Sequence, residues 1–191
     1  MNLFDAHHHL WDLGAVDYVW LKQHGVPKPF GDPTPIQKDY LPEHFLEDVS
    51  GAPDVDLAGS AHIQVDGALA DPVSETSWLS KLSKSGIPSA IVGFVDLTKE
   101  DAEAVLKNHL YFDEFRGVRQ IIGLLEQRPD LSFTKEHLLR NSSWQENFAL
   151  LEKHNLSFDL QLYPEQMKEA ARVPGWFPKS PYCDRPRRKS V

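Results

Sequence analysis

The stretch AIVGFVD, residues 90–96, decides the fold class. Apart from the final Asp96 it is built of apolar residues and one glycine, with no alternation of polar and apolar positions. A short apolar run of this kind is typical of a parallel strand that is covered on both faces. The stretch therefore predicts a parallel sheet between layers of helices.

The segments on either side alternate between strand and helix. Strands are predicted at 2–8, 57–66, 115–122 and 156–163, and helices at about 73–85, 98–109, 143–154 and 164–172. Thr98 with Asp101, and Ser143 with Glu146, have the spacing of a box-like helix start, and Asn155 is a left-handed terminator. The alternation predicts a parallel α/β architecture with right-handed crossovers.

A (β/α)8 barrel is one form of that architecture, and its reactive groups collect at the C-terminal ends of the strands. Polar residues stand at the ends of the predicted strands: His7, His9, Gln64, Asp66, Asp96, Arg119 and Tyr163. Five strands cannot close such a barrel, which needs about 250 residues. We therefore expect a partial TIM (β/α)8 barrel of about five βα units that lacks the C-terminal strands.

Residues 11–45 form a long segment rich in proline and aromatic residues between the first two strands. A connection of this length in a compact domain is typical of a functional lid. We expect a lid-like insertion at 11–45.

The composition favours a small-molecule substrate. A net charge of −8 argues against nucleic-acid and anionic-membrane partners, which need a clustered positive face. No apolar run approaches the roughly 20 residues of a membrane span, and Asp5 and the histidines stand where a signal peptide has its basic and apolar segments. A cytoplasmic location is expected. The single Cys183 excludes an intramolecular disulfide, so a metal must be held by histidines and carboxylates.

Three consecutive histidines lie near the start of the chain, in FDAHHHLWD, residues 4–12. Because side chains alternate along a strand, His7 and His9 share one face and His8 points to the other. Two imidazoles at a strand end can bind one divalent cation, and histidine is a common zinc ligand. The alternatives are a chance cluster or a partial tag, but these residues lie inside an apolar strand followed by Trp11.

Other polar residues have two readings each. Arg119 can hold a substrate carboxylate through its bidentate fork, or form a structural ion pair. Gln64 and Tyr163 can bind substrate or satisfy the barrel interior. Glu75 lies in the first turn of a helix, where a negative charge is stabilised anyway, so a structural role is favoured. The remaining histidines have no motif context and are expected at the surface or in packing: His24, His44, His109, His137 and His154.

Several of these motifs occur together in one known family. The D-A-H-x-H-x-W-D start, HIQVD followed by ETSWL, VGFVDL, RGVRQ and FDLQLY resemble the amidohydrolase 2 family over residues 2 to about 172. The resemblance implies a TIM-barrel hydrolase that acts on a lactone or similar carbonyl compound, as fuconolactonases do. Members differ in whether they use a metal, so the resemblance implies zinc or another divalent cation, or no metal.

The last segment of the chain departs from the family. Family members continue with a strand resembling V-I-D-H-x-G-K and later supply an aspartate, whereas residues 173–191 are basic and rich in proline. Codons that encode residues 177–190 can be chosen so that, read one base later, they spell FPKVPIVIDHAGK. We therefore interpret 1–172 as the N-terminal part of the barrel and 173–191 as a non-family tail created by a single-base frameshift shortly before Val173.

The resemblance assigns roles to the residues that match. His7 and His9 bind the metal or polarise the carbonyl, and Arg119 positions a substrate carboxylate. Two histidine ligands predict weak or absent metal binding by this chain. The alternative to a hydrolase is an inactive remnant, at most a binding module, whose open sheet edges favour self-association.

Overall fold

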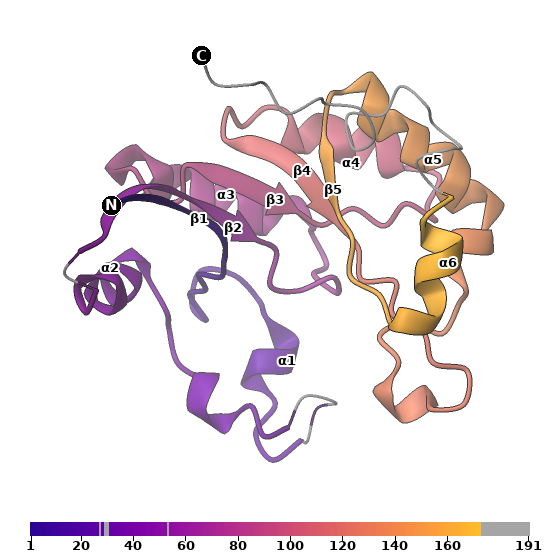
Figure 1. Cartoon of the computed structure of the whole chain (residues 1–191), viewed down its shortest axis with the longest axis horizontal. Coiled ribbons are helices and arrows are strands. Elements are labelled where there is room, and N and C mark those ends of the chain that lie inside the picture. The colour runs from indigo at the N-terminus through magenta and orange to yellow at the C-terminus, as the bar shows by residue number, and fades with distance from the viewer. Residues whose placement is uncertain (27, 29–30, 53, 173–191) are drawn as a thin grey trace. The chain divides into compact units, whose positions relative to one another are not determined.

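A computed structural model of the chain describes residues 1–26, 28, 31–52 and 54–172, and the predicted tail lies outside the described residues. The chain forms two compact units. The first comprises Met1–Phe94 and Lys107–Arg116. The second comprises Val95–Leu106 and the described part of Gly117–Val191. The chain can be followed through both by its colour in Figure 1, from indigo to yellow.

Five strands follow one another in chain order in the sheet. They are β1 (Asn2–His8), β2 (Asp56–Ile63), β3 (Ala90–Gly93), β4 (Phe115–Arg119) and β5 (Ser157–Asp159). In the first unit β1 pairs with β2 and β2 with β3, and in the second unit the end of β4 pairs with β5; all three pairings are parallel. Sequential parallel strands joined by helices are the pattern of a (β/α)8 barrel, so the predicted α/β class is confirmed.

The helices fall between the strands. Four of them match predicted helices, whereas the two between the first two strands were not predicted. They are α1 (Val19–Lys22), α2 (Pro42–Ser50), α3 (Val73–Leu82), α4 (Ala102–His109), α5 (Ser142–Lys153) and α6 (Met167–Ala170). Short 3₁₀ turns are formed by Thr34–Ile36, Ser83–Ser85, Pro129–Leu131, Leu138–Arg140 and Pro164–Gln166.

Both predicted box-like helix starts are wrong. The Thr98 hydroxyl donates to Asp96 (2.7 Å) instead of capping, and α4 begins only at Ala102. The cap of α5 is Asn141, whose side chain accepts from the Trp144 N–H. The Thr98 hydroxyl is thus bonded to Asp96, and α5 is capped by Asn141, a residue type that is a strong N-cap. The left-handed terminator is confirmed, because Asn155 has φ 53°.

Several strands are shorter than predicted. β2 ends at Ile63, and β5 covers only Ser157–Asp159. Single backbone bonds continue the parallel pairing beyond these ends, from the Gln64 N–H to the Val92 carbonyl (2.8 Å) and from Ile122 to Gln161 (3.0 Å). Gln64, Asp66 and Tyr163 thus lie in connecting loops beyond the strands.

In the first unit a buried histidine is packed against β3. His109 is fully buried and stacks on Phe115, with ring centroids 4.7 Å apart. A Cβ atom at Gly93 would lie 3.0 Å from both rings and 3.1 Å from the Thr76 hydroxyl. A larger residue at Gly93 would have to displace this packed layer, since interiors are close-packed.

The first half of the 11–45 segment has a core of its own. Val16, Tyr18 and Leu21 are buried and pack with Trp78 of α3 and the loop after β2. The base of the segment is closed, because Trp11 and Tyr40 exchange backbone hydrogen bonds of 2.9 Å in both directions. Burial of three such side chains contributes about 1.5–3 kcal/mol each. The segment is therefore anchored at its base, and its function as a lid stays a prediction.

In the second unit aromatic residues form the core. Trp144 and Phe148 of α5 pack against Phe158 of β5, with ring centroids 5.0 to 5.8 Å apart. The Trp144 indole N–H donates to the Gln120 side chain, which in turn donates to Asp96 (both 2.9 Å). A polar network thus ties the end of β4 to α5.

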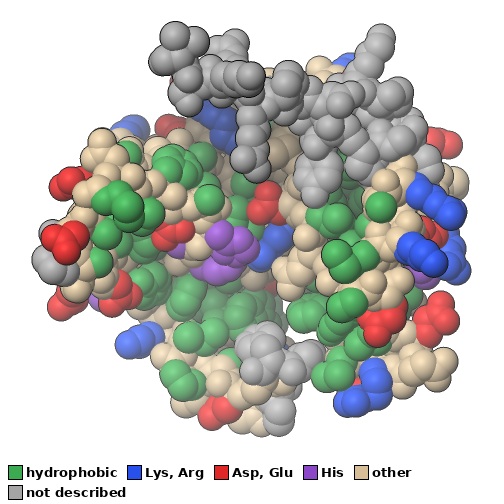
Figure 2. Space-filling model, in the orientation of Figure 1, with side chains coloured by type: hydrophobic (Ala, Val, Ile, Leu, Met, Phe, Trp, Pro, Cys, Tyr) green, Lys and Arg blue, Asp and Glu red, His purple; other side chains and the backbone are tan. Residues whose placement is uncertain are grey.

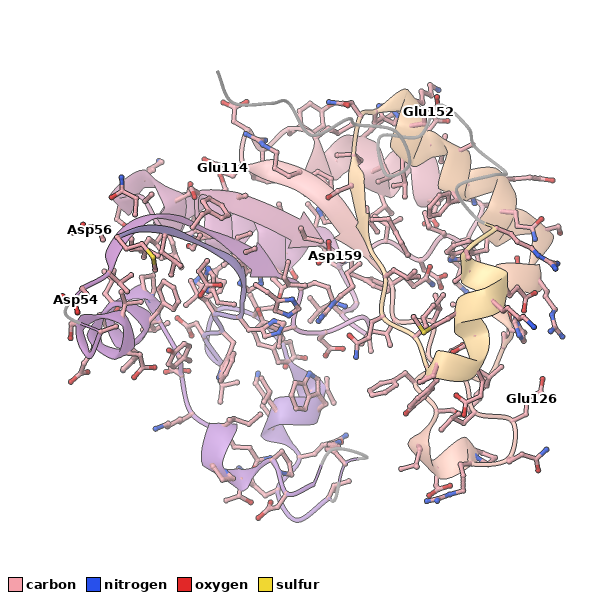
Figure 3. All side chains as sticks on the ribbon, in the orientation of Figure 1. Asp54, Asp56, Glu114, Glu126, Glu152 and Asp159 are labelled. Carbon is pink, nitrogen blue, oxygen red and sulfur yellow. The ribbon has the colours of Figure 1, made fainter. Side chains whose placement is uncertain are left out.

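β1 is the first strand of the sheet, and its side chains are largely exposed. Phe4 is 51% exposed and Leu3 38%, and Figure 2 shows hydrophobic side chains at the surface on this face. The N-terminal amine donates to the Asp54 carbonyl (2.6 Å) and lies 3.7 Å from the Asp56 carboxylate; both residues are labelled in Figure 3. Self-association through such an edge stays a prediction. Among the described residues, no helix has the length and apolar character needed to cross a bilayer.

Candidate active site

Two imidazoles meet at the C-terminal end of β1. The Nε2 atoms of His7 and His9 are 3.3 Å apart, and the ring planes are nearly perpendicular. His9 Nδ1 lies 2.7 Å from the Ile63 carbonyl, which can only accept, so Nδ1 carries the proton. The Nε2 lone pair of neutral His9 is therefore on the side that faces His7. The predicted shared face of His7 and His9 is confirmed.

His8 has a different environment. It is 7% exposed and stacks on Phe45 of α2, with ring centroids 4.4 Å apart. Neither of its ring nitrogens has a hydrogen-bond partner among the described residues. Burial, reinforced by His62, lowers the pKa of His8 to about 4. His8 is thus a neutral packing residue at neutral pH.

Two buried residues of the first unit extend the cluster. The Leu10 N–H donates to Nδ1 of His62 (3.1 Å), and Nε2 of His62 lies 3.7 Å from the Glu75 carboxylate. Glu75 also accepts from the Tyr18 hydroxyl (2.8 Å) and the Val65 N–H (3.0 Å). Burial beside this carboxylate raises the pKa of Tyr18 far above its ordinary value, so the hydroxyl remains a donor.

Sequence reasoning did not single out His62. The available signal was its place among the polar positions that alternate with Ala61, Ile63 and Val65. The structural role favoured for Glu75 agrees with its burial, since it is only 2% exposed. Its position next to His62 could not be read from the helix start alone.

Gln64 and Asp66 follow β2 in the same unit. Gln64 is 2% exposed at the end of the strand. Asp66 accepts from the Ala68 N–H (2.7 Å), and burial raises the pKa of its carboxyl. The Asp66 side chain thus shapes the start of the loop that connects the strand to α3.

Arg119 and Tyr163 lie in the second unit. Arg119, at the end of β4, is 7% exposed, and one guanidinium nitrogen lies 3.4 Å from the Gln161 side-chain oxygen. The Tyr163 hydroxyl donates to the Leu131 carbonyl and so fixes the loop after β4. The assembly of His7, His9 and Gln64 with Arg119 and Tyr163 into one site stays a prediction.

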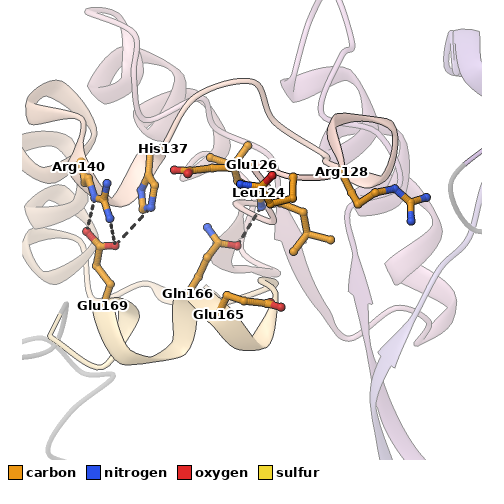
Figure 4. A pocket seen from close by; sticks show the side chains of 10 residues that line it. Leu124, Glu126, Arg128, His137, Arg140, Glu165, Gln166 and Glu169 are labelled. Atoms are coloured by element: carbon orange, nitrogen blue, oxygen red, sulfur yellow. Dashed lines mark hydrogen bonds and ion pairs between the residues drawn. The ribbon is translucent and has the colours of Figure 1, made fainter.

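A cavity of about 450 Å³ lies within the second unit, between the loop after β4 and α6 (Figure 4). Arg140 and His137 both contact the Glu169 carboxylate, at 3.0 and 3.3 Å. Gln166 accepts from the Leu124 N–H and donates to the Ile122 carbonyl. These polar contacts hold the loop to the helix.

The residues present fit one side of a metal site. His7 and His9 supply two nitrogen atoms, and the Ile63 carbonyl orients His9 as second-layer partners orient histidine ligands. Histidine side chains reach the surface on the face shown in Figure 2. Within the part of the chain that the structure describes, no group of three or more His, Cys, Asp or Glu residues could hold a metal ion. Structural and catalytic zinc sites have at least three protein ligands.

The order of the parallel strands agrees with that of solved structures. An amidohydrolase from Burkholderia multivorans with bound HEPES superposes with a TM-score of 0.62 at 18% identity, covering 90% of this chain and 52% of that one. The chain has the fold of an amidohydrolase. Amidohydrolase 2 from Bifidobacterium longum subsp. infantis gives a TM-score of 0.60 at 14% identity, covering 94% of this chain and 59% of that one.

The same Burkholderia amidohydrolase with bound zinc gives a TM-score of 0.61 at 19% identity and 53% coverage of that chain. The uncharacterized protein y4mH of Sinorhizobium fredii (strain NBRC 101917 / NGR234) is 36% identical over 177 residues. That match covers 92% of this chain and 59% of y4mH, so the chain spans less than two thirds of the relatives that share the amidohydrolase fold or the sequence. No family model matches the sequence.

Proposed function

We propose that this chain carries part of the active site of an amidohydrolase-type hydrolase that acts on a lactone or similar small carbonyl compound through an activated water. The observation that carries the proposal is the meeting of the His7 and His9 Nε2 atoms, 3.3 Å apart, at the C-terminal end of β1. In barrels of this fold the reactive groups lie at that end of the strands.

His7 and His9 would hold the divalent cation, with zinc favoured, or polarise the substrate carbonyl directly if no metal is used. A bound cation supplies Lewis-acid activation of the carbonyl or of the attacking water. The bond from His9 Nδ1 to the Ile63 carbonyl keeps the Nε2 atom of His9 as the coordinating or accepting nitrogen. A backbone carbonyl of the chain thus fixes the tautomer of His9.

Arg119, Gln64 and Tyr163 are the proposed substrate-binding residues. A guanidinium can hold a sugar-acid carboxylate through two parallel hydrogen bonds. Arg119 therefore selects lactones that carry a carboxylate, whereas Gln64 and Tyr163 bind hydroxyl groups.

The test is hydrolysis of a panel of neutral and carboxylated sugar lactones by the 191-residue chain, with added Zn²⁺ and with EDTA. Turnover that disappears in the His7→Ala/His9→Ala double variant supports the proposal. Arg119→Ala should then raise KM for the carboxylated lactones and leave KM for the neutral ones unchanged. If no lactone is hydrolysed above the rate of the double variant under either condition, the hydrolase proposal fails for this chain.

One observation favours the alternative, a non-catalytic module. The described residues provide two converging imidazoles but no third His, Cys, Asp or Glu to complete a metal site. Such a module binds substrate or product without turning it over. Calorimetric binding of the same lactones and their open acids, without hydrolysis, identifies it.

A further inference from the structure

We propose that Glu75 is a positioning residue of the His7/His9 site, acting through His62 and the backbone at Leu10. The proposal rests on the proposed function only in naming the site that Glu75 positions. Every contact on which the proposal rests lies in the first unit, between β1, β2, α3 and the start of the 11–45 segment.

The first step is the buried charge. Glu75 is 2% exposed and Tyr18 is fully buried. The carboxylate accepts from the Tyr18 hydroxyl and the Val65 N–H, at 2.8 and 3.0 Å. A buried carboxylate needs such donors, because an uncompensated charge in a protein interior is costly. Glu75 is therefore held in one place by two elements outside its own helix.

The second step is the tautomer of His62. Its Nδ1 accepts from the Leu10 N–H (3.1 Å), so the proton of the neutral ring is on Nε2. That atom is 3.7 Å from the Glu75 carboxylate, with both side chains buried. At 3.7 Å the contact is an electrostatic one, longer than a hydrogen bond. The negative charge favours the ring form that presents N–H to Glu75 and a lone pair to Leu10.

The third step connects His62 to His9 through the backbone of β1 and β2. Leu10 follows His9 in the chain, and Ile63 follows His62. One bond runs from the Leu10 N–H to His62, and the other from His9 Nδ1 to the Ile63 carbonyl (2.7 Å). These two bonds join the ends of β1 and β2 and fix the plane of the His9 ring. Glu75 thus determines the orientation of His9 without contacting substrate or metal.

The test uses the 191-residue chain and three readouts. Long-range ¹H–¹⁵N spectra report the His62 tautomer, amide hydrogen exchange reports the Leu10 N–H, and calorimetry reports zinc affinity. In the wild type the His62 proton should be on Nε2. In Glu75→Gln, which removes the charge but keeps the size and an acceptor oxygen, that preference should weaken. We expect about 10-fold faster exchange at Leu10 and about 10-fold weaker zinc binding, the range seen for second-layer partners.

Tyr18→Phe is the matched control. It removes an equally buried hydrogen bond to the same carboxylate but leaves the charge facing His62. The His62 tautomer and the Leu10 exchange rate relative to global unfolding should stay as in the wild type. Equal changes in Tyr18→Phe and Glu75→Gln would show a general structural role and overturn the proposal.

Two further outcomes are decisive. A wild-type His62 with its proton on Nδ1 overturns the proposal whether or not Glu75→Gln folds, and a proton on Nε2 supports it. A wild-type chain that binds no zinc contradicts the proposed metal site, while the tautomer and exchange readouts still decide the role of Glu75.

Discussion

Two imidazoles in the first unit, His9 and His109, differ in the contact that their second ring nitrogen makes. Both bond to a backbone carbonyl, His9 to Ile63 and His109 to Phe94. The second nitrogen of His109 is bonded to the Thr76 hydroxyl (2.9 Å), and its ring is sandwiched in the core. The second nitrogen of His9 meets a second imidazole at a strand end. His109 therefore uses both ring nitrogens in hydrogen bonds within the core, whereas His9 keeps its Nε2 atom directed at His7 in the candidate site.

The largest expected effect is on zinc affinity and concerns His9, the site histidine of this comparison. His7→Ala and His9→Ala should each lower zinc affinity by about 100-fold. The loss of a ligand should cost as much as the largest effect seen when a second-layer partner is lost. His24→Ala, an exposed histidine, is the control and should leave affinity unchanged. Competition against a zinc-binding dye measures all three. Equal affinity in the His9 and His24 variants would contradict the metal role.

The next effect concerns the His109 side and pH. Burial lowers the pKa of His109 from an ordinary value of 6.5 to about 4. The unfolded chain therefore binds a proton between these values that the folded chain does not, so stability present above pH 6.5 is lost as the pH falls towards 4. The loss from pH 7 to pH 5 is about 2 kcal/mol for this one group.

Urea unfolding of the wild type and His109→Gln at pH 7 and pH 5 measures that loss. The glutamine side chain can keep one donor and one acceptor but does not titrate. The difference between the two pH values should be smaller in the variant by about 2 kcal/mol. An unchanged difference would mean that His109 is accessible to protons in the folded state.

The smallest expected effect is on the free energy of unfolding and concerns the hydrogen bond between Thr76 and His109. Thr76→Val has nearly the same shape but leaves Nδ1 of the buried His109 without its donor. We expect a loss of about 1 kcal/mol in the free energy of unfolding at pH 7. Thr134→Val, which removes a hydroxyl bond from an exposed turn, should change it by less than about 0.5 kcal/mol. Equal values would argue that the Thr76 hydroxyl contributes nothing to the core.

The sequence was sufficient for the order of the strands and for the helices that follow β2, but α1 and α2 were not predicted. The apolar run at 90–96 and the alternation at 57–66 follow from burial, which acts on every residue of a strand and leaves a repeated pattern. Helix starts failed at Thr98 and Ser143 because Asp96 engages the Thr98 hydroxyl and Asn141 caps α5 in place of Ser143. These contacts depend on local geometry that spacing alone does not specify.

The site was predictable only in part. Alternation along a strand placed His7 and His9 on one face, which the contact between their Nε2 atoms bears out. The contact between His62 and Glu75 joins β2 to α3 and depends on how the helix packs. No periodicity within one element reports a distance between two elements. The roles of Arg119, Gln64 and Tyr163 stay predictions for the same reason.

The Trp11–Tyr40 pairing makes the stretch between them a closed module with a narrow base. Because its two ends are tied to each other two residues after His9, the intervening residues can change in length or composition while the base keeps its geometry. Exchange of this module between relatives would therefore test the predicted lid role while the backbone pairing at its base is kept.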